Sequence, residues 1–207
     1  MITIYTAIFG DYDTLKEPLY NDPLIEYVCF TDKERESKNW DVRVVPIIES
    51  SPRREARKYK ILSHKYIDNE ISLWIDGSRY INTNPIPYIN EWLHRADFCT
   101  TIHPVRDCVY TEAAECIRLF KGNPKTIVKQ MRKYKEEEYP SHNGMIMSGV
   151  LLRNRTPEII QLEKDWWKEL SEWSVRDQLS FNYIAWKNKF NYGLFDWRKI
   201  TSSRGHK

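Results

Sequence analysis

The chain has 207 residues, of which 41% are hydrophobic and 29% are charged, and its formal net charge is +3. This length and composition are typical of a globular protein with one substantial core. The small net charge argues against a dedicated nucleic-acid binder, which usually needs a strongly basic surface. The sequence shows neither a signal peptide nor a transmembrane segment of roughly 20 apolar residues, so we expect a cytoplasmic protein.

The first third of the chain predicts three strands, a helix and a fourth strand. Strands are expected at 2–9, 25–30 and 42–48, where β-branched and aromatic residues concentrate. Between 53 and 67 the apolar residues recur at helical spacing. The run 71–75 is apolar throughout and bounded by polar residues, which indicates a strand buried on both faces.

The rest of the chain continues the alternation of helices and strands. The expected elements are a helix at 85–95, a strand at 98–102, helices around 109–120 and 124–138, a strand at 145–152, a helix with Thr156 as N-cap and Pro157 as its first residue, and a last helix at 175–187. Strands that alternate with helices predict a mainly parallel sheet covered on both faces. We expect one α/β domain over 1–207, which can be a module of a longer protein.

Several polar groups follow predicted strands, and Asp76-Gly77-Ser78 is the clearest candidate among them for a ligand-binding site. Ligands of open α/β sheets bind beyond the carboxyl ends of the strands. A carboxylate there can hold Mg²⁺ or Mn²⁺ against a diphosphate, because these hard cations prefer oxygen ligands. An ordinary turn is an equally good interpretation, since Asp-Gly is a common turn pair.

Arg57 and Lys60 belong to a basic run on the predicted helix at 53–67. They are three residues apart and therefore share one face, from which they can neutralise a diphosphate. Taken alone, the run is more often a solvated helix face. Contact with nucleic-acid phosphates is a third interpretation, which the small net charge disfavours.

Asp177 lies near the start of the last predicted helix, in the segment SVRDQ. Its carboxylate can act as a general base or orient a sugar. Ser174 and Asp177 also fit the capping-box pattern, and from sequence alone this interpretation is the stronger one. The two roles are compatible if the start of the helix points into a cleft.

Six blocks along the chain, taken together, resemble a known family. They are TAIFGDYD, RREARKYKILSHKY, SLWIDGS, HPVRDCVYTEA, SGVLLRN and RDQLSFNY, in this order. They are similar to a glycosyltransferase-like family that includes plant Golgi proteins of cell-wall polysaccharide formation and the N-terminal domain of a chlorella-virus capsid-glycan enzyme. The resemblance covers nearly the whole chain and implies a GT-A fold, with a nucleotide-sugar in a Rossmann-like half.

The resemblance also implies which residues bind the donor. The block TAIFGDYD implies backbone contacts from Ala7, Ile8 and Phe9 to the base and ribose. Ser148 and Gly149 are expected to face the donor sugar.

The metal site and the reacting carbon are assigned by the same resemblance. WIDGS stands where GT-A enzymes have the metal-binding Asp-x-Asp, so Asp76 is the expected ligand, with Gly77 beside it contacting the donor. Ser78 replaces the second Asp and would bind weakly or through water. His206 stands where some GT-A enzymes have a late metal-ligating histidine. Asp177-Gln178 resembles the acidic motif beside the anomeric carbon of the sugar.

The resulting prediction is a metal-dependent glycosyltransferase that uses Mn²⁺ or Mg²⁺. It would transfer a hexose-type sugar from a nucleotide-sugar, with uridine diphosphate favoured, to the hydroxyl of a glycan or protein-linked glycan. Asp177 would serve as base if configuration inverts, or steady an oxocarbenium-like state if configuration is retained; the sequence leaves both open. One alternative is a non-catalytic carbohydrate-binding module that stacks sugars on its eight Trp. Another is a phosphohydrolase built on Asp76 and the basic helix.

Overall fold

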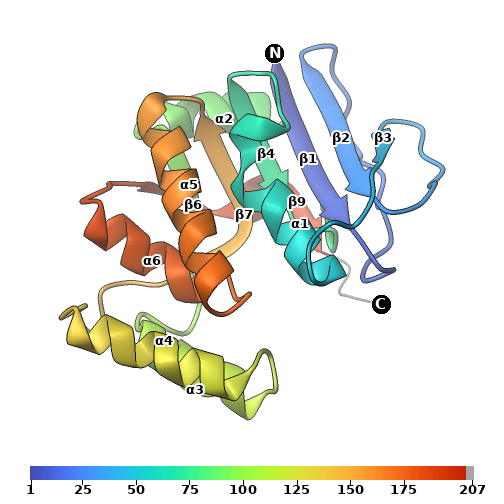
Figure 1. Cartoon of the computed structure of the whole chain (residues 1–207). Coiled ribbons are helices and arrows are strands. Elements are labelled where there is room, and N and C mark those ends of the chain that lie inside the picture. Colours follow the sequence, from blue (N-terminus) through green and yellow to red (C-terminus); the bar gives the residue numbers. More distant parts are fainter. Residues whose placement is uncertain (204–207) are drawn as a thin grey trace.

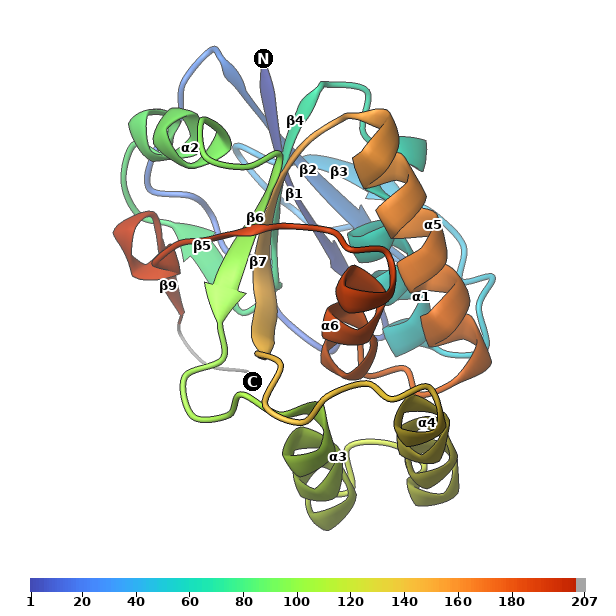
Figure 2. The same ribbon diagram turned by 90° about the vertical axis from the view of Figure 1, so that its left-hand side faces the viewer.

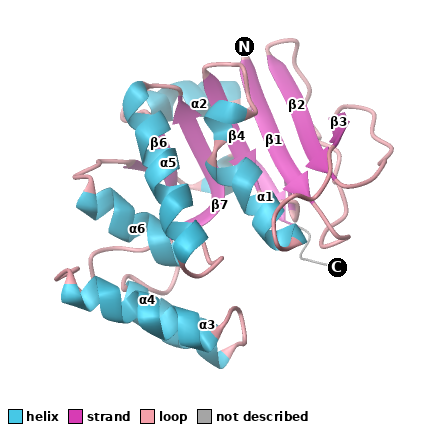
Figure 3. Cartoon of the chain, in the orientation of Figure 1, coloured by secondary structure: helices cyan, strands magenta, loops and turns pink. Residues whose placement is uncertain are grey.

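A seven-stranded mixed sheet forms the centre of the computed structural model, which describes residues 1–203 (Figures 1 and 3). The strand order is β3-β2-β1-β4-β7-β6-β8, and within the described residues only β7 runs against the others. The strands are β1 (Ile2–Ile8), β2 (Ile25–Thr31), β3 (Asp41–Val44), β4 (Ile71–Ile75), β6 (Phe98–Ile102), β7 (Ile146–Asn154) and β8 (Gly193–Leu194). The predicted fold class, a mainly parallel sheet flanked by helices, is therefore confirmed.

Helices cover both faces of this sheet. One face carries α1 (Pro52–Ile61), α5 (Pro157–Glu172) and α6 (Gln178–Lys187), and Figures 1 and 2 show α2 (Ile86–Leu93) on the other. The second face also carries a small sheet of two strands, β5 (Arg79–Ile81) and β9 (Thr201–Ser203). The remaining elements are two short 3₁₀ turns, η1 (Ser63–Lys65) and η2 (Trp197–Lys199). An antiparallel pair, α3 (Val109–Arg118) and α4 (Pro124–Glu136), projects beyond one end of the sheet.

Alternate side chains of the central strands fill two apolar layers. Tyr5 and Trp74 point to the layer beneath α1 and α5, where Trp166 is fully buried. Ile4 and Leu73 point to the layer shared with Trp92 of α2. Each such side chain contributes about 1.5–3 kcal/mol by leaving water. The two layers hold the sheet rigid and so fix the ends of its strands, where polar residues gather.

Two predicted elements end several residues earlier in the structure than in the sequence analysis. The strand expected at 42–48 stops at Val44, and the backbone N–H groups of Ile48 and Glu49 instead donate to the buried Glu55 carboxylate. The helix expected at 53–67 stops at Ile61, although apolar residues continue at helical spacing. In both places a buried carboxylate competes with regular backbone pairing; for the helix it is that of Glu163, which accepts hydrogen bonds from the turn that follows.

The start of α5 agrees with the prediction. Thr156 is its N-cap, with the hydroxyl accepting from the N–H of Ile159, and Pro157 is the first helical residue. Within the described residues, none of the helices combines the length and apolar character needed to cross a bilayer.

Candidate functional site

A pocket of about 680 Å³ opens at the carboxyl ends of β1 and β4. This volume falls in the range of about 300–1,000 Å³ that is usual for small-molecule sites. Segments far apart in the sequence form its walls, namely the β1 end, α1, the β4 end, β7 and the start of α6. The predicted site residues that line it are Ala7, Ile8, Phe9, Arg57, Asp76, Gly77, Ser78, Ser148, Gly149, Asp177 and Gln178.

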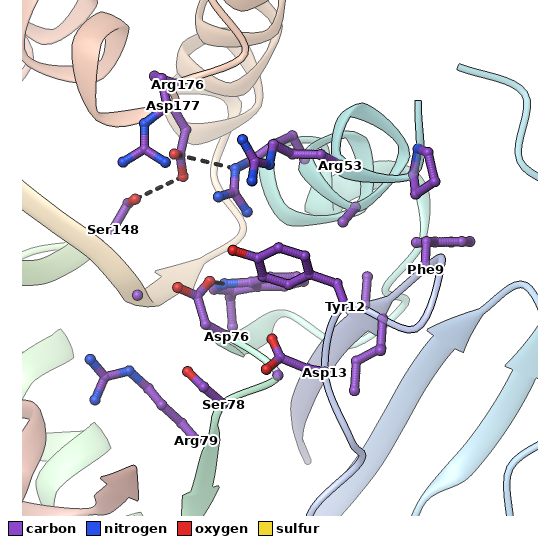
Figure 4. Close-up of a pocket in the computed structure, with 18 of the residues that line it drawn as sticks. Phe9, Tyr12, Asp13, Arg53, Asp76, Ser78, Arg79, Ser148, Arg176 and Asp177 are labelled. Carbon is purple, nitrogen blue, oxygen red and sulfur yellow. Dashed lines mark hydrogen bonds and ion pairs between the residues drawn. The ribbon is translucent and has the colours of Figure 1, made fainter. Parts of the chain in front are cut away.

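The turn after β1 is held close to the start of α1. Gly10 adopts a left-handed backbone (φ +61°), and its N–H donates to both carboxylate oxygens of Asp32 at 3.2 Å. A Cβ at Gly10 would lie only 2.9 Å from the ring of Pro52. Glycine is therefore required here both for the backbone conformation and for the close approach. The turn places Tyr12 at the pocket, and Figure 4 shows its ring between Asp76 and Arg53.

Two further glycines allow the strand ends to pack closely. A Cβ at Gly77 would lie 2.9 Å from Cγ1 of Ile8. At Gly149 it would lie 3.1 Å from Nε of Arg79 and 3.3 Å from Oδ2 of Asp76. A side chain at Gly77 would therefore collide with Ile8 of β1, and one at Gly149 would crowd the polar groups of Arg79 and Asp76.

Lys60 joins the two carboxylates at the base of the pocket. Its Nζ lies 2.7 Å from Oδ2 of Asp177, 3.1 Å from Oδ1 of Asp76 and 3.2 Å from Oγ of Ser148. An ammonium has three donors, and these three partners match them. Lys60 is 0% exposed and lies behind the lining of the pocket. The structure thus places it against Asp76 and Asp177 and not toward a bound diphosphate.

Asp177 is surrounded by cations and by one hydroxyl. Besides its contact with Lys60, it lies 3.2 Å from Nε of Arg57 through Oδ1, and Oδ2 accepts from Oγ of Ser148 at 2.7 Å. Burial alone would raise the pKa of Asp177, but the charges of Arg57, Lys60 and Arg176 outweigh it and hold this pKa well below its usual range. The carboxylate is therefore ionised at neutral pH and poorly suited to accept a proton.

The capping-box interpretation of Ser174 and Asp177 is wrong. The last helix begins at Gln178 and not near 175, and although Asp177 is its N-cap residue, its side chain makes no capping hydrogen bond. The hydroxyl of Ser174 accepts from the backbone N–H of Arg176, two residues on. The carboxylate of Asp177 instead contacts Arg57 and Lys60, so it does not cap the helix.

Asp76 presents one free carboxylate oxygen to the pocket. Oδ1 accepts from Nζ of Lys60 and from Nε1 of Trp74, the latter at 2.9 Å. Within the described chain, Oδ2 has no hydrogen bond, and Figure 4 shows the carboxylate facing the open space between Ser148 and Arg79. A single oxygen of this kind suits Mg²⁺ or Mn²⁺ when substrate phosphates supply further ligands.

The protein ligands for such a cation are few. Among residues 1–203 there is no cluster of three or more His, Cys, Asp or Glu side chains able to hold a metal. Ser78 is buried and lines the pocket beside Asp76. His206, the third predicted ligand, lies outside the described residues. The donor set seen here therefore fits a cation that is held jointly by Asp76 and a bound diphosphate.

Cationic side chains that the sequence analysis did not assign also line the pocket, alongside Arg57: Arg53, Arg79, Lys121 and Arg176. In the described part of the chain, Nη1 of Arg79 and Nε of Arg176 are buried without a hydrogen-bond partner. The guanidinium of Arg79 stacks on Trp197, 3.8 Å from the ring centroid. Cationic side chains around a pocket favour an anionic ligand, because charge-assisted hydrogen bonds to guanidinium groups are strong.

The missed residues differ in how visible they were. Arg79 directly follows Asp-Gly-Ser, Arg176 directly precedes Asp177, and Tyr12 lies inside TAIFGDYD, so each is adjacent to a recognised motif. Lys121 carries no local signal, because only the packing of the α3–α4 loop brings it to the pocket.

Comparison with known proteins gives a consistent result. The curated relative "probable hexosyltransferase MUCI70" from Arabidopsis thaliana is 26% identical over 228 residues, covering 94% of this chain and 39% of the relative. The chain thus spans well under half the length of that protein.

The fold is shared with a solved glycosyltransferase structure. Mouse xyloside xylosyltransferase 1 matches with a TM-score of 0.50 and 10% identity, over 94% of this chain and 84% of that chain. The galactosyltransferase LgtC, solved with donor and acceptor sugar analogues, gives a TM-score of 0.48 and 13% identity, over 96% of this chain and 74% of that chain. The fold is accordingly of the GT-A type.

The model of one family, the TOD1/MUCI70 glycosyltransferase-like domain, matches residues 1–201. The resemblance drawn from the six sequence blocks is thereby confirmed at the level of the family. The chain belongs to the TOD1/MUCI70 family of glycosyltransferase-like domains.

Proposed function

We propose that this domain transfers a hexose-type sugar from a nucleotide-sugar, with a UDP-sugar favoured, to the hydroxyl of a glycan or protein-linked glycan. The observation that supports this most is that buried Lys60 contacts both Asp76 and Asp177. They lie at the base of a pocket that is lined by more cationic side chains than carboxylates. Such a charge balance suits a nucleoside diphosphate. The name of the Arabidopsis relative, a probable hexosyltransferase, supports a hexose as the transferred group.

The donor would lie along the β1 end with its diphosphate over the cations. Ala7, Ile8 and Phe9 line this side of the pocket and offer backbone groups to the base and ribose. The ring of Tyr12 supplies a flat surface on which a base can stack. Arg79 lines the pocket beside Asp76, and we assign its guanidinium to a phosphate oxygen of the donor.

Transfer would depend on stabilising the leaving group. As the bond between the anomeric carbon and the diphosphate breaks, negative charge grows on the nucleoside diphosphate, where Arg57 and Arg79 can stabilise it. A bound Mn²⁺ or Mg²⁺ would add Lewis-acid stabilisation of the same charge. Oδ2 of Asp76 would hold that ion, with Ser78 through water. The role of His206 as a further ligand stays a prediction.

Asp177 would act as a fixed negative charge and not as a base. The charges of three neighbouring cations outweigh its burial and hold its pKa well below the usual range, so it remains ionised while the acceptor hydroxyl attacks. The proton of that hydroxyl would pass to the departing diphosphate as its bond to the anomeric carbon breaks. An ionised carboxylate steadies the positive charge that develops at the anomeric carbon. Of the two roles considered for this residue, we therefore propose the orienting and charge-stabilising one.

Titration calorimetry with UDP, in the presence and absence of Mn²⁺, tests this function. We expect binding that strengthens with Mn²⁺, and a loss of that strengthening in Asp76→Asn while the melting temperature is kept. Binding of free oligosaccharides without any nucleotide would favour the carbohydrate-binding module instead. Release of inorganic phosphate from a sugar nucleotide, without nucleoside diphosphate, would favour the phosphohydrolase.

A further inference from the structure

The loop between α3 and α4 holds an exposed aromatic residue in a strained backbone. Phe120 has φ +53° and its side chain is 89% exposed. The N–H of Lys121 donates to the carbonyl of Cys116 at 2.8 Å, the bond that closes a helix end of the Schellman type. Phe120 thus occupies the left-handed position where glycine is the usual residue, because a Cβ is strained there.

This loop forms part of the wall of the pocket. Lys121, the next residue, lines the pocket. A Cβ at Gly122 would lie 3.5 Å from Oγ of Ser174 and 3.8 Å from Cγ of Arg176, the residue before Asp177. Figure 1 shows the α3–α4 loop below the sheet, on the side of α1. Phe120 therefore directly precedes a residue of the pocket wall, and its exposed ring lies outside the lining of the pocket.

Phe120 is unfavourable there on two independent grounds of stability. Its ring remains in water and gains nothing from burial, and its backbone is in a conformation that costs free energy for any residue with a Cβ. Phe120 thus combines a strained backbone with an exposed apolar side chain, next to a binding site. A contact with ligand is the expected compensation for such a residue.

A sugar ring is the ligand that fits an exposed aromatic next to a glycosyl donor. The C–H groups on one face of a pyranose form a flat apolar surface, which packs on an aromatic ring while the hydroxyls stay in water. The proposed function assigns the cationic side chains of the pocket to the donor. The ring of Phe120, outside the pocket lining, is then available to the acceptor.

We propose that Phe120 is part of the acceptor site and that its ring stacks on a pyranose of the acceptor glycan. This assignment rests on the proposed function, because it presumes that the second substrate is a glycan. It adds a residue of the α3–α4 loop to a site otherwise built from the ends of the sheet strands.

The Phe120→Gly variant tests the proposal because stability and binding should move in opposite directions. Relief of the left-handed strain should raise Tm by about 2–4 °C. Loss of the ring should raise the half-saturating acceptor concentration at least tenfold, while the dissociation constant for UDP stays unchanged. Phe120→Trp should keep acceptor binding, because it keeps an aromatic face.

Matched controls come from the same backbone conformation elsewhere. Glu138 (φ +59°) and Lys189 (φ +52°) follow α4 and α6, are exposed and lie outside the pocket. Their replacement by glycine should raise Tm in the same way and leave the acceptor concentration dependence unchanged.

The acceptor probe is selected by presenting the UDP-loaded domain to an array of gluco-, galacto-, xylo- and rhamno-oligosaccharides, and the oligosaccharide retained best is then titrated. An unchanged half-saturating concentration in Phe120→Gly, or an array that retains no oligosaccharide, would overturn the proposal while UDP binding continued to support the donor site. A wild-type chain that binds no UDP would instead remove the proposed function, and this assignment with it.

Discussion

Two buried charge clusters lie at opposite ends of β4 and β7, and they differ in what they face. At one end, Lys60, Asp76 and Asp177 border a pocket of about 680 Å³. At the other end, Glu163 accepts from the hydroxyl of Ser63 and lies 3.1 Å from Nε of Arg153, and the adjoining cavity is only about 10 Å³.

The difference shows how buried charge relates to function. Both clusters contain fully buried ionic groups, so burial alone does not identify a site. The cluster around Glu163 joins α5 to β7 and to the turn after α1, and although Nε2 of His64 there also lacks a partner among the described residues, the adjoining cavity is too small for a substrate. The cluster around Lys60 borders the larger pocket, where Oδ2 of Asp76 accepts no hydrogen bond from residues 1–203 and faces open space. Unsatisfied groups beside a cavity are the part that calls for a ligand.

Removal of the Asp76 carboxylate, which faces the pocket, is the most severe test of this difference between the two clusters. We expect Asp76→Ala to lower transfer by about 1,000-fold, as loss of a key electrostatic group in an active site does. Its Tm should change less than that of a variant that leaves a buried charge unpaired, because Lys60 keeps its ion pair with Asp177. Steady-state kinetics with a UDP-sugar and Mn²⁺, together with a thermal melt, measure both effects. Full activity in this variant would take Asp76 out of the mechanism.

The cluster around Glu163 should respond in the opposite sense. Glu163→Gln leaves Arg153 as a buried charge without its counter-charge, so we expect a loss of about 3–5 kcal/mol in the free energy of unfolding. Affinity for UDP, measured on the folded protein, should stay the same. Glu172→Gln is the matched control, since Glu172 is an exposed residue of the same helix. Weakened UDP binding in Glu163→Gln would show that the two clusters are not independent.

A methyl group in the open site should act mainly on binding. In Gly149→Ala the added carbon would crowd Nε of Arg79 and Oδ2 of Asp76, at 3.1 and 3.3 Å. We expect a loss of about tenfold in UDP affinity, or about 1.4 kcal/mol, with a small change in Tm. Calorimetry on both proteins measures the ratio. Equal affinity would mean that the diphosphate does not occupy the space between these two groups.

The charge state of Asp177 predicts a weaker, pH-dependent effect. Its folded pKa lies below its unfolded value, so the stability it contributes is fully present above the unfolded pKa of about 3.9 and is lost as pH falls toward the folded pKa. The difference in unfolding free energy between wild type and Asp177→Asn should therefore be constant from pH 7 to 5 and shrink below about pH 4. Urea unfolding at these pH values measures it, and a difference that already shrinks near pH 6 would mean that this pKa is not depressed.

Regular features of the chain could be predicted from sequence because they depend on local patterns. The apolar run 71–75 and the alternation of strands with helices led to the right class of sheet, and the N-cap at Thr156 follows from its neighbours. The carboxyl-end rule led to Asp76, which follows β4 at the pocket. Ser148 was assigned from the family resemblance and reaches the same pocket from the amino-terminal part of β7, which runs antiparallel to β4.

The remaining features of the site depend on which residues, distant in sequence, each side chain contacts after folding. The position of Lys60 on the α1 face was readable, but its burial against Asp76 and Asp177 depends on how α1 packs on the sheet. Asp177 matched a capping box, and only the packed structure shows that cations take its carboxylate. Lys121 reaches the pocket through a helical hairpin that the local sequence does not position.

A crystal structure of the domain soaked with a UDP-sugar and Mn²⁺ tests the central claim most directly. The account predicts nucleotide density in the pocket at the ends of β1 and β4, with the diphosphate against the guanidinium of Arg79 and a cation on Oδ2 of Asp76. Nucleotide bound elsewhere on the molecule, with this pocket containing only solvent at saturating donor, would contradict it.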